Sequence, residues 1–158
     1  MYGRTVDWSD RILVEALQRD ATTSYADLGR LVGLSAGAAH ERVRKLRERG
    51  VITRTTIEVD PAAVGRGVLA FVTIDATSWM GGADTAAAVA AITAVEEAHI
   101  VAGGASMLLK VRTATTAALQ EVLRAVFDIP GVRGTNSIVV LQTLFERPVD
   151  PTEEPSDA

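Results

Sequence analysis

Cationic side chains are concentrated in one short stretch of the sequence. Residues 36–54 contain six of them, Arg42, Arg44, Lys45, Arg47, Arg49 and Arg54, against only Glu41 and Glu48. Lys and Arg neutralise phosphate groups, and the planar fork of Arg also fits the O6 and N7 atoms of guanine. This stretch therefore has the residue types that bind a nucleic acid.

The net charge of the whole chain, −4, conceals a difference between its two parts. Residues 1–66 carry 11 Lys and Arg against 9 Asp and Glu, whereas residues 67–158 carry 5 against 11. A basic part and an acidic part in one chain indicate that only the first faces a polyanion. Any contact with double-stranded DNA must therefore come from a local patch and not from the overall charge.

Other chemistries lack the residues that they need. The chain has no Cys and only two His, which excludes a disulfide framework, a thiol nucleophile and a Cys-liganded zinc site. We therefore expect no metal site and no cofactor. His99, near Glu96 and Glu97, is the one group that looks catalytic, and a histidine that begins a strand beside a helix end is the plainer interpretation.

The length and composition fit one ordinary domain or two small ones. The 158 residues are 47% hydrophobic and only 4% aromatic, so the core must consist mostly of Ala, Val, Leu and Ile. We see no signal peptide and no apolar run long enough to span a bilayer. We therefore expect a cytoplasmic protein without a membrane partner.

Three helices are predicted in the basic part, and they must position its cationic side chains. The first covers residues 7–19. The second begins after the cap Ser24 and ends at Gly33, and the third runs from the cap Ser35 to about residue 49. Two short helices joined by a Gly-containing turn are typical of a helix-turn-helix, although an ordinary helical hairpin has the same pattern.

The third helix has one apolar side and one polar side. Ala39, Val43 and Leu46 recur at helical spacing and predict the buried side. The opposite side is small where the helix begins, which allows close approach to a groove, and charged further along. The residues that we expect to contact DNA are Ser24, Ser35, Gly37, Ala38, His40, Glu41, Arg42, Arg44, Lys45 and Arg54.

Plainer roles are open for several of these side chains. Glu41 has the i,i+4 spacing for an ion pair with Lys45 on the helix surface. His40 could be an exposed polar residue that reads no base, and Arg47 and Arg49 could serve only the C-terminal carbonyl groups of the helix. The basic face as a whole therefore indicates DNA binding more specifically than any one of its members.

The rest of the chain predicts a second domain. Residues 51–59 alternate between apolar and polar and predict a short strand or wing, followed by a linker with Pro and Gly. The pattern then predicts strand 68–76, helix 84–97, strand 99–102, strand 107–112, helix 116–127 and strand 132–146. We therefore expect a DNA-binding domain in residues 1–65, a second domain in residues 66–147 and a disordered acidic tail in residues 148–158.

The order β-α-β-β-α-β is the ferredoxin-like arrangement, with two helices on one face of an antiparallel sheet. The fold class is therefore α+β, a winged helix-turn-helix followed by a ferredoxin-like domain. We expect the other face of the sheet to be apolar and to be covered by a second copy of the chain. A two-fold homodimer suits a helix-turn-helix because it reads two half-sites.

Several short motifs, taken in order, resemble the Lrp/AsnC family of transcriptional regulators over residues 6 to about 147. They are VDWSDRIL at 6–13, SYADL at 24–28, VGLS at 32–35, RVRKL at 42–46, GVI at 50–52, Gly103, and PGV at 130–132. The resemblance implies an N-terminal DNA-binding domain and a RAM-type C-terminal domain that dimerises and senses amino acids. It also implies that dimers assemble further, commonly into octamers, with the effector between dimers.

The effector-binding positions that the resemblance implies fall on two segments, Gly103, Gly104, Ala105 and Ser106 in a loop, and Thr135, Asn136 and Ser137 further on. The family usually has an acidic or aromatic residue after the loop glycine and an Asp just beyond, and this chain has neither. Backbone amides could bind a carboxylate, but a Ser hydroxyl is a weak substitute for the acid that accepts from an ammonium group. The effector is therefore unusual or absent, and the two glycines could form a plain hairpin turn.

The function that combines these features is a sequence-specific transcriptional regulator whose second domain senses an amino acid or a related small metabolite. Ala38, Ala39 and Glu41 depart from the family in the third helix, which leaves the DNA target open. Two alternatives are a small-molecule-sensing dimer that does not bind DNA and a ferredoxin-like dimeric enzyme. Only the regulator would lose DNA affinity and salt dependence when the cationic residues of the third helix are neutralised.

Overall fold

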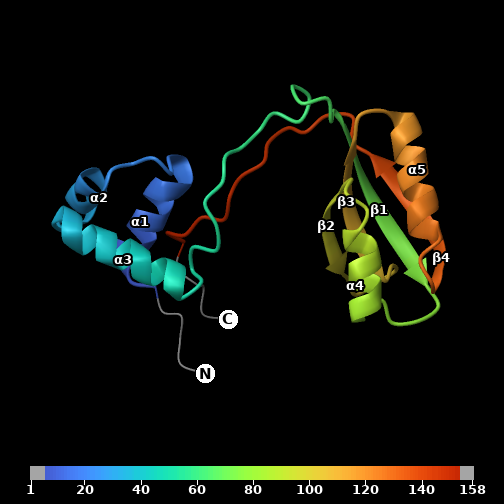
Figure 1. Ribbon diagram of the computed structural model, residues 1–158, viewed down its shortest axis with the longest axis horizontal. Coiled ribbons are helices and arrows are strands. Elements are labelled where there is room, and N and C mark those ends of the chain that lie inside the picture. The colour runs from blue at the N-terminus through green and yellow to red at the C-terminus, as the bar shows by residue number, and fades with distance from the viewer. Residues whose placement is uncertain (1–5, 154–158) are drawn as a thin grey trace. The chain divides into compact units, whose positions relative to one another are not determined.

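The computed structural model describes residues 6–153, which form two compact units (Figure 1). The first unit comprises the residues up to Glu58 together with the segment that begins at Phe145. The second unit is Val59–Leu144. The division therefore falls before the boundary expected at residue 65, and the chain returns to the first unit at its end.

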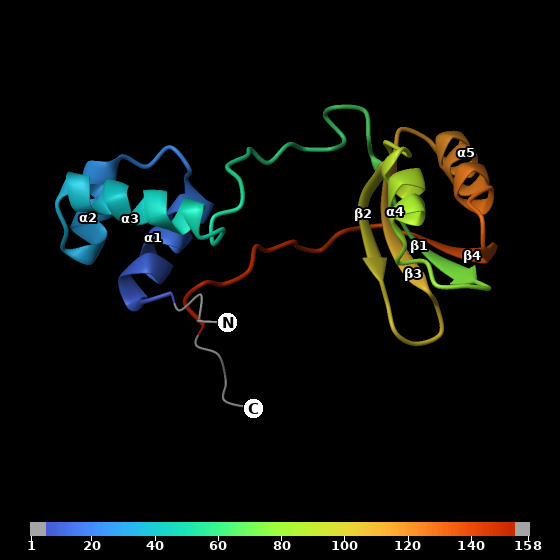
Figure 2. The same cartoon turned by 60° about the horizontal axis from the view of Figure 1, so that its bottom comes forward.

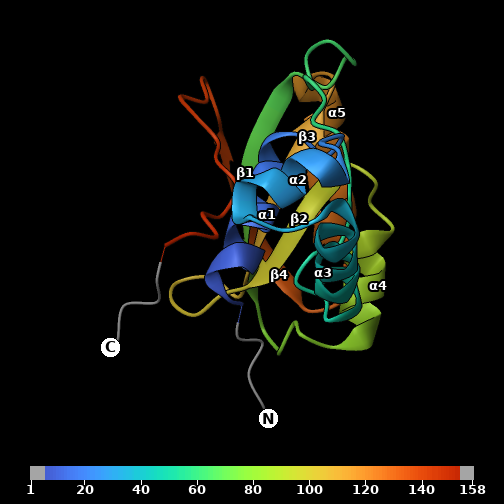
Figure 3. The same ribbon diagram turned by 90° about the vertical axis from the view of Figure 1, so that its left-hand side faces the viewer.

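Three helices build the first unit and are labelled in Figure 3: α1 is Trp8–Arg19, α2 is Tyr25–Val32 and α3 is Ala36–Glu48. Each begins at a polar cap, Asp7, Ser24 or Ser35, whose side chain accepts a hydrogen bond from the backbone N–H three residues further on. The helix-turn-helix expected from the sequence is confirmed.

The turn between α2 and α3 is tight because of two glycines. Gly33 ends α2 with a φ of 70°, in the left-handed region where a side chain is disfavoured. Gly29 lies inside α2, and a Cβ atom there would be only 2.5 Å from the backbone oxygen of Leu34. Leu13, Leu28, Ala39 and Val43 form the buried core below this turn.

The prediction of a strand or wing at residues 51–59 is wrong. Within the described chain, no helix or strand lies between α3 and the first strand of the second unit, and Ile57 is 81% exposed. Alternating β-branched residues favour an extended backbone, but a strand also needs a neighbour to accept its hydrogen bonds, and none pairs with these residues here. Residues 51–59 therefore form no wing beside the helix-turn-helix in the described part of the chain.

The C-terminal segment also differs from the expected disordered tail. Gln18 donates to the carbonyl oxygen of Val149 at 3.2 Å, and Arg11 donates to those of Pro151 and Glu153 at 2.8 and 3.1 Å. These hydrogen bonds attach residues 149–153 to the side of α1. Residues 154–158 of the expected tail lie outside the described residues.

The second unit contains one four-stranded antiparallel sheet and two helices (Figure 2). Its elements are β1 Val68–Ala76, α4 Ala83–Ala90, β2 Val95–Ile100, β3 Met107–Thr113, α5 Thr116–Phe127 and β4 Val132–Val139. The strand order is β2-β3-β1-β4, with all neighbours antiparallel. This order confirms the ferredoxin-like arrangement. None of the described helices is long and apolar enough to cross a membrane.

The bounds of three elements differ from those expected. β2 is Val95–Ile100 instead of residues 99–102, and α4 and β4 both end earlier than predicted. The helix expected at residues 84–97 ends at Ala90, because Val95 and Glu97 pair with β3 and belong to β2. The last strand ends at Val139 instead of residue 146. Its partner β1 begins at Val68, so the strand has no further neighbour once Val140 has donated to the carbonyl oxygen of Leu69.

One face of the sheet forms the core together with both helices. Its buried members include Val72, Ile74, Leu109 and Val111 from the strands and Val89, Leu119, Val122 and Val126 from the helices. The other face is only partly apolar, against expectation. Phe71, Leu108 and Ile138 lie on it beside a charged group made of Glu96, Glu97, His99, Lys110 and Arg112.

Candidate DNA interface and effector site

The exposed side of α3 is the candidate DNA interface. Ala39, Val43 and Leu46 are fully buried, as predicted, and they fix which side of α3 faces outward. Gly37 and Ala38 are exposed on the outward side, and a Cβ atom added at Gly37 would meet nothing within 4 Å. The beginning of α3 is therefore narrow enough to approach another surface closely.

Further along, the charged side chains on the outward side of α3 form ion pairs with one another. Arg44 donates to both carboxylate oxygens of Glu41, from Nη2 at 2.6 Å and from Nε at 2.8 Å, and it also bonds to Glu48. Lys45 lies 3.6 Å from Glu41. The Arg44 hydrogen bond lowers the pKa of Glu41 to about 2, so this carboxylate is ionised at neutral pH. The suggested pair with Lys45 is present, but Arg44 is the closer partner.

Arg42 lies on the flank of α3 that faces α1. Its Nη1 atom donates to Asp7 and to Asp10, both at 2.7 Å. Asp10 is 5% exposed, and Arg49 is a second cation 3.7 Å from its carboxylate. The DNA contact expected of Arg42 gains no support from this geometry, because its guanidinium joins two helices of the same unit.

The other expected DNA contacts are spread over the unit. The Ser24 and Ser35 hydroxyl groups are used as helix caps, and each lies at the exposed beginning of its helix. His40 stacks edge-on against Tyr25 with 4.7 Å between the ring centroids. Arg54 lies beyond α3 and, with Arg47, lines a cavity of about 290 Å³ beside α1.

The expected effector loop is the hairpin between β2 and β3. Gly103 has a φ of 131°, which only glycine adopts without strain, whereas an added Cβ at Gly104 would meet nothing within 4 Å. The backbone N–H of Ser106 is engaged by the carbonyl oxygen of Ile74 at 2.8 Å, and its carbonyl oxygen accepts from Val101. The backbone of this segment therefore forms the hairpin turn that was the plainer interpretation. The Ser106 N–H group already has an acceptor and is not available to a carboxylate.

The second expected effector segment lies on β4, across β1 from the loop. Thr135 and Ser137 are on the helix side of the sheet, and Asn136 is on the other side, because neighbouring residues of a strand alternate. Thr135 lines a shallow cavity with residues of α5, including Gln120 and Phe127. Within one chain, the two segments therefore do not form one pocket among the described cavities.

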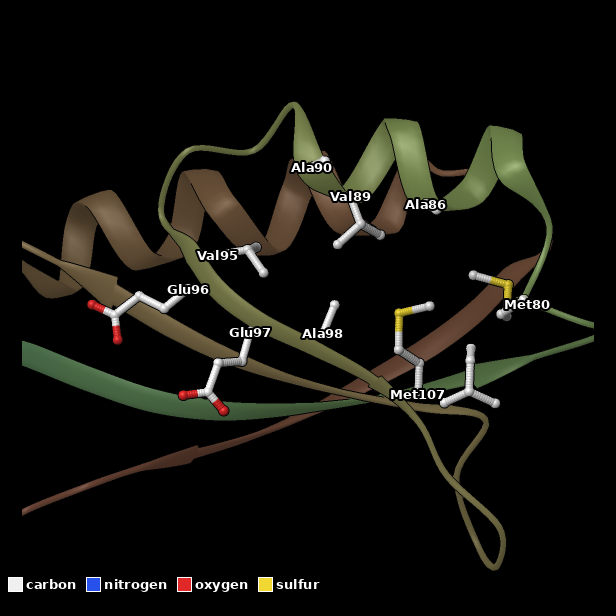
Figure 4. A pocket seen from close by; sticks show the side chains of 11 residues that line it. Met80, Ala86, Val89, Ala90, Val95, Glu96, Glu97, Ala98 and Met107 are labelled. Carbon is white, nitrogen blue, oxygen red and sulfur yellow. The ribbon is translucent and has the colours of Figure 1, made fainter. Parts of the chain in front are cut away.

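The structure contains an apolar cavity that the sequence did not indicate. It has a volume of about 430 Å³ and lies between α4 and the edge strand β2 (Figure 4). Its lining includes Met80, Val89, Val95, Ala98, Ile100 and Met107. Figure 4 shows the Glu96 and Glu97 carboxylates pointing away from it. Ile100 and Met107 flank the hairpin loop, so the cavity adjoins the expected effector loop.

Sequence reasoning missed this cavity because α4 was expected to continue through Val95. A longer helix would have placed Val95, Glu96 and Glu97 on α4 instead of on β2. The strand assignment also changes the setting of His99, which lies in β2 with its Nε2 atom 3.1 Å from Glu97 and its side chain 53% exposed. It is not among the residues that line the cavity.

These features define a class of protein: a helix-turn-helix whose third helix has one exposed side, joined to a ferredoxin-like domain with its own cavity. The chain belongs to the Lrp/AsnC family. The AsnC-type helix-turn-helix domain matches residues 6–47, and the Lrp/AsnC ligand binding domain matches residues 68–150. The protein is a DNA-binding transcriptional regulator and not an enzyme.

The chain is similar to curated regulators over most of its length. The regulatory protein AsnC of Escherichia coli is 33% identical over 152 residues, which are 96% of this chain and 100% of that protein. Its solved structure has a TM-score of 0.82 and covers 93% of this chain and 99% of that one. The transcriptional regulator LrpA of Mycobacterium tuberculosis is 36% identical over 143 residues, 90% of this chain and 95% of that protein.

One of the similar solved structures contains a small molecule. It is a feast or famine regulatory protein from Mycobacterium tuberculosis complexed with L-methionine. Its structure is 35% identical, has a TM-score of 0.82, and covers 90% of this chain and 96% of that one.

Proposed function

We propose that α3 enters the major groove of DNA with its exposed side. The observation that carries this proposal is the contrast between the two sides of α3, one fully buried and the other small at its beginning and charged further along. Gly37 and Ala38 allow close approach, and Ala38 can contact a thymine methyl group. Arg44 is placed for a base edge and Lys45 for a phosphate.

The expected flanking contacts belong to the same proposal. The beginnings of α2 and α3, at Ser24 and Ser35, present backbone N–H groups that suit phosphate oxygens. His40, on α3, and Arg54, beyond its end, are included in the proposal as contacts to the DNA backbone. Arg42 is left out of the proposed interface because two carboxylates engage it.

The test is a pair of charge-matched double variants of the full-length protein. Arg44→Ala with Lys45→Ala removes two cations from α3, whereas Arg19→Ala with Arg124→Ala removes two exposed cations elsewhere. Duplexes enriched by the unmodified protein from a randomised DNA pool serve as the probe. We expect the α3 variant to lose at least tenfold in affinity, with a smaller salt slope, and the control to change little. Equal effects would refute the docking of α3.

We propose further that the protein acts as a homodimer that assembles into larger rings such as octamers. The partly apolar face of the sheet, with Phe71, Leu108 and Ile138, would be covered by the second copy. Two helix-turn-helix units related by a two-fold axis would read the two halves of an operator. Light scattering across the working concentration range tests this, and a constant monomer mass would contradict it.

We also propose that the second domain senses an L-amino acid with an apolar side chain. The support comes from the apolar cavity of about 430 Å³ beside the hairpin loop, and from the relative that was solved with L-methionine. The apolar side chain would enter the cavity, while the polar end would face the loop at Gly103 and Gly104. Thr135, Asn136 and Ser137 are the residues that a neighbouring protomer would supply in an assembled ring.

A cavity-filling variant tests the effector proposal. Ala98 lies on β2 and lines the cavity, so Ala98→Trp would fill it, whereas Ala87→Trp places the same side chain on the exposed side of α4. We expect calorimetry to detect binding of methionine or leucine to the unmodified protein and to Ala87→Trp but not to Ala98→Trp. DNA binding without amino acids should be the same in all three. Amino-acid binding that survives Ala98→Trp would exclude the cavity.

A further inference from the structure

The charged side chains on the outward side of α3 constrain one another. Arg44 donates from Nε and Nη2 to the two oxygens of Glu41, and from Nη1 to Glu48. A guanidinium group has five N–H donors, so two remain for a further acceptor. Glu41 therefore fixes the plane of the Arg44 guanidinium before any DNA is present.

We propose that Glu41 is a positioning residue that sets the sequence specificity of this regulator. It holds the Arg44 guanidinium for a guanine edge and opposes its use as a phosphate ligand. This inference rests on the proposed docking of α3 in the major groove, and it names the base-pair class that α3 selects, G·C.

The geometry of the pair supports this role. Glu41 takes the Nε–H and one N–H of Nη2, and Glu48 takes one N–H of Nη1. The two N–H groups that remain, one on each terminal nitrogen, can match the O6 and N7 acceptors of guanine. An unrestrained Arg side chain on a DNA-facing helix is free to reach the nearest phosphate instead. The bidentate contact with Glu41 therefore favours the base over the backbone.

The charge of the same face supports it as well. Glu41, Arg44, Lys45 and Glu48 cancel one another, so the middle of α3 offers no net positive charge to a phosphate backbone. A fixed carboxylate beside the groove repels phosphate in every register. This repulsion is compensated only where the position of α3 along the DNA places a guanine next to Arg44. Glu41 therefore contributes to discrimination between DNA sequences and not simply to affinity.

Position along the helix separates Glu41 from Glu48. Residues in the N-terminal part of a recognition helix contact base edges, and the later turns move away from them. Glu41 lies three residues before Arg44, toward the beginning of α3, whereas Glu48, the last residue of α3, lies four residues after Arg44. Glu48 is therefore a natural control, since it also bonds to Arg44 and carries the same charge.

The experiment compares Glu41→Gln with Glu48→Gln and Glu15→Gln in the full-length protein. Glu15 pairs with Arg19 on α1, so its variant has the same change in net charge away from α3. Gln keeps the length of the side chain and a carbonyl acceptor. The probes are a duplex enriched from a randomised pool by the unmodified protein and a scrambled duplex of the same composition, both measured by fluorescence anisotropy at several salt concentrations.

For Glu41→Gln we expect the preference for the enriched over the scrambled duplex to fall about tenfold, within the range for one bidentate base contact. Affinity for the scrambled duplex should rise, and its salt slope should steepen by about one phosphate contact. A repeated selection with this variant should lose the enrichment of guanine at one position of each half-site. Glu48→Gln and Glu15→Gln should keep both the preference and the guanine.

The outcomes separate the inference from the proposal beneath it. If Glu41→Gln changes the preference no more than Glu15→Gln does, while Arg44→Ala with Lys45→Ala still loses at least tenfold in affinity, Glu41 has no positioning role. If the double variant also binds normally, α3 is not the DNA interface. Circular dichroism is the check that each variant is folded. We expect all of them to fold because Glu41 and Glu48 are about half exposed.

Discussion

The Arg42 guanidinium on α3 donates a hydrogen bond of 2.7 Å to the carboxylate of Asp10 on α1, which is almost completely buried. The same Nη1 atom donates to Asp7, the cap of α1. One cation thus joins the beginning of the first helix to the middle of the third. The contact holds α3 against α1, and Arg42 is directed toward α1 instead of the proposed interface.

Removal of the Arg42 charge should therefore loosen the first unit. In Arg42→Gln the buried Asp10 carboxylate keeps Arg49 as a cation at 3.7 Å but loses its shorter charged partner. We expect the free energy of unfolding of the first unit to fall by about 1–3 kcal/mol. The decrease is smaller than for a fully buried ion pair because Arg42 is partly exposed. Hydrogen exchange of the α1 and α3 amides measures this. Arg30→Gln, which removes a surface pair on α2, is the control, and equal exchange in both variants would contradict the prediction.

Acid should weaken the same connection. The hydrogen bond from Arg42, followed by that from the Asp10 backbone N–H, lowers the pKa of Asp7 below its ordinary value. Because the folded-state pKa is the lower one, ionised Asp7 stabilises the fold at neutral pH. That contribution disappears as the pH falls from the ordinary value near 4 through the folded-state pKa.

The variant Asp7→Asn tests this pH dependence, since Asn keeps an oxygen that can cap α1 but has no charge. At pH 7 the variant should unfold at a lower urea concentration than the unmodified protein. At pH 3 the difference between the two midpoints should be smaller. A difference that stays constant between pH 7 and pH 3 would show that the charge of Asp7 contributes nothing.

Much of the fold could be predicted from the sequence because the signals were local. Polar caps, glycines at helix ends and apolar residues at helical spacing depend on a few neighbouring residues, and they located α1, α2, α3 and α5. The end of α4 was missed because Ala-rich sequence favours a helix wherever it occurs, and the pairing of residues 95–97 with β3 depends on a distant partner. The strand or wing predicted at residues 51–59 was wrong for a related reason, because a strand requires a pairing partner that local sequence does not reveal.

The candidate site was predictable in its charge but not in its contacts. The sequence located the basic helix and its outward side. It did not reveal that Arg42 turns toward α1, since that depends on the position of Asp10 in space. Likewise, the cavity beside β2 arises between a helix and a strand whose boundary the sequence placed incorrectly.

The turn of the helix-turn-helix should not tolerate a side chain at Gly29. A Cβ atom there would lie 2.5 Å from the backbone oxygen of Leu34, and backbone cannot move aside without shifting α3. We expect Gly29→Ala to lower the stability of the first unit by about 1–3 kcal/mol, as in other overpacked sites, and to weaken DNA binding. Thermal unfolding and anisotropy provide the two measurements. Unchanged values for both would mean that the turn relaxes freely.

Gly37 should behave in the opposite way. An added Cβ meets nothing within 4 Å, and Ala favours a helix over Gly by about 0.5–1 kcal/mol, so Gly37→Ala should stabilise α3. If the beginning of α3 approaches DNA closely, the same methyl group should reduce DNA affinity. The expected result is a higher melting temperature with weaker binding. A variant that is more stable and binds equally well would place Gly37 outside the interface.

Gly104 offers a way to test the effector loop by adding the acid that the family usually has there. A side chain at Gly104 has open space, whereas the φ of 131° at Gly103 disfavours any side chain. Gly104→Asp would supply a carboxylate acceptor for an ammonium group, so we expect calorimetry to show tighter amino-acid binding. Gly104→Asn, of the same size but uncharged, should gain much less. DNA affinity measured without amino acids should be nearly unchanged, because the loop belongs to the second unit. A larger effect on DNA affinity than on amino-acid binding would contradict the assignment of this loop to the effector.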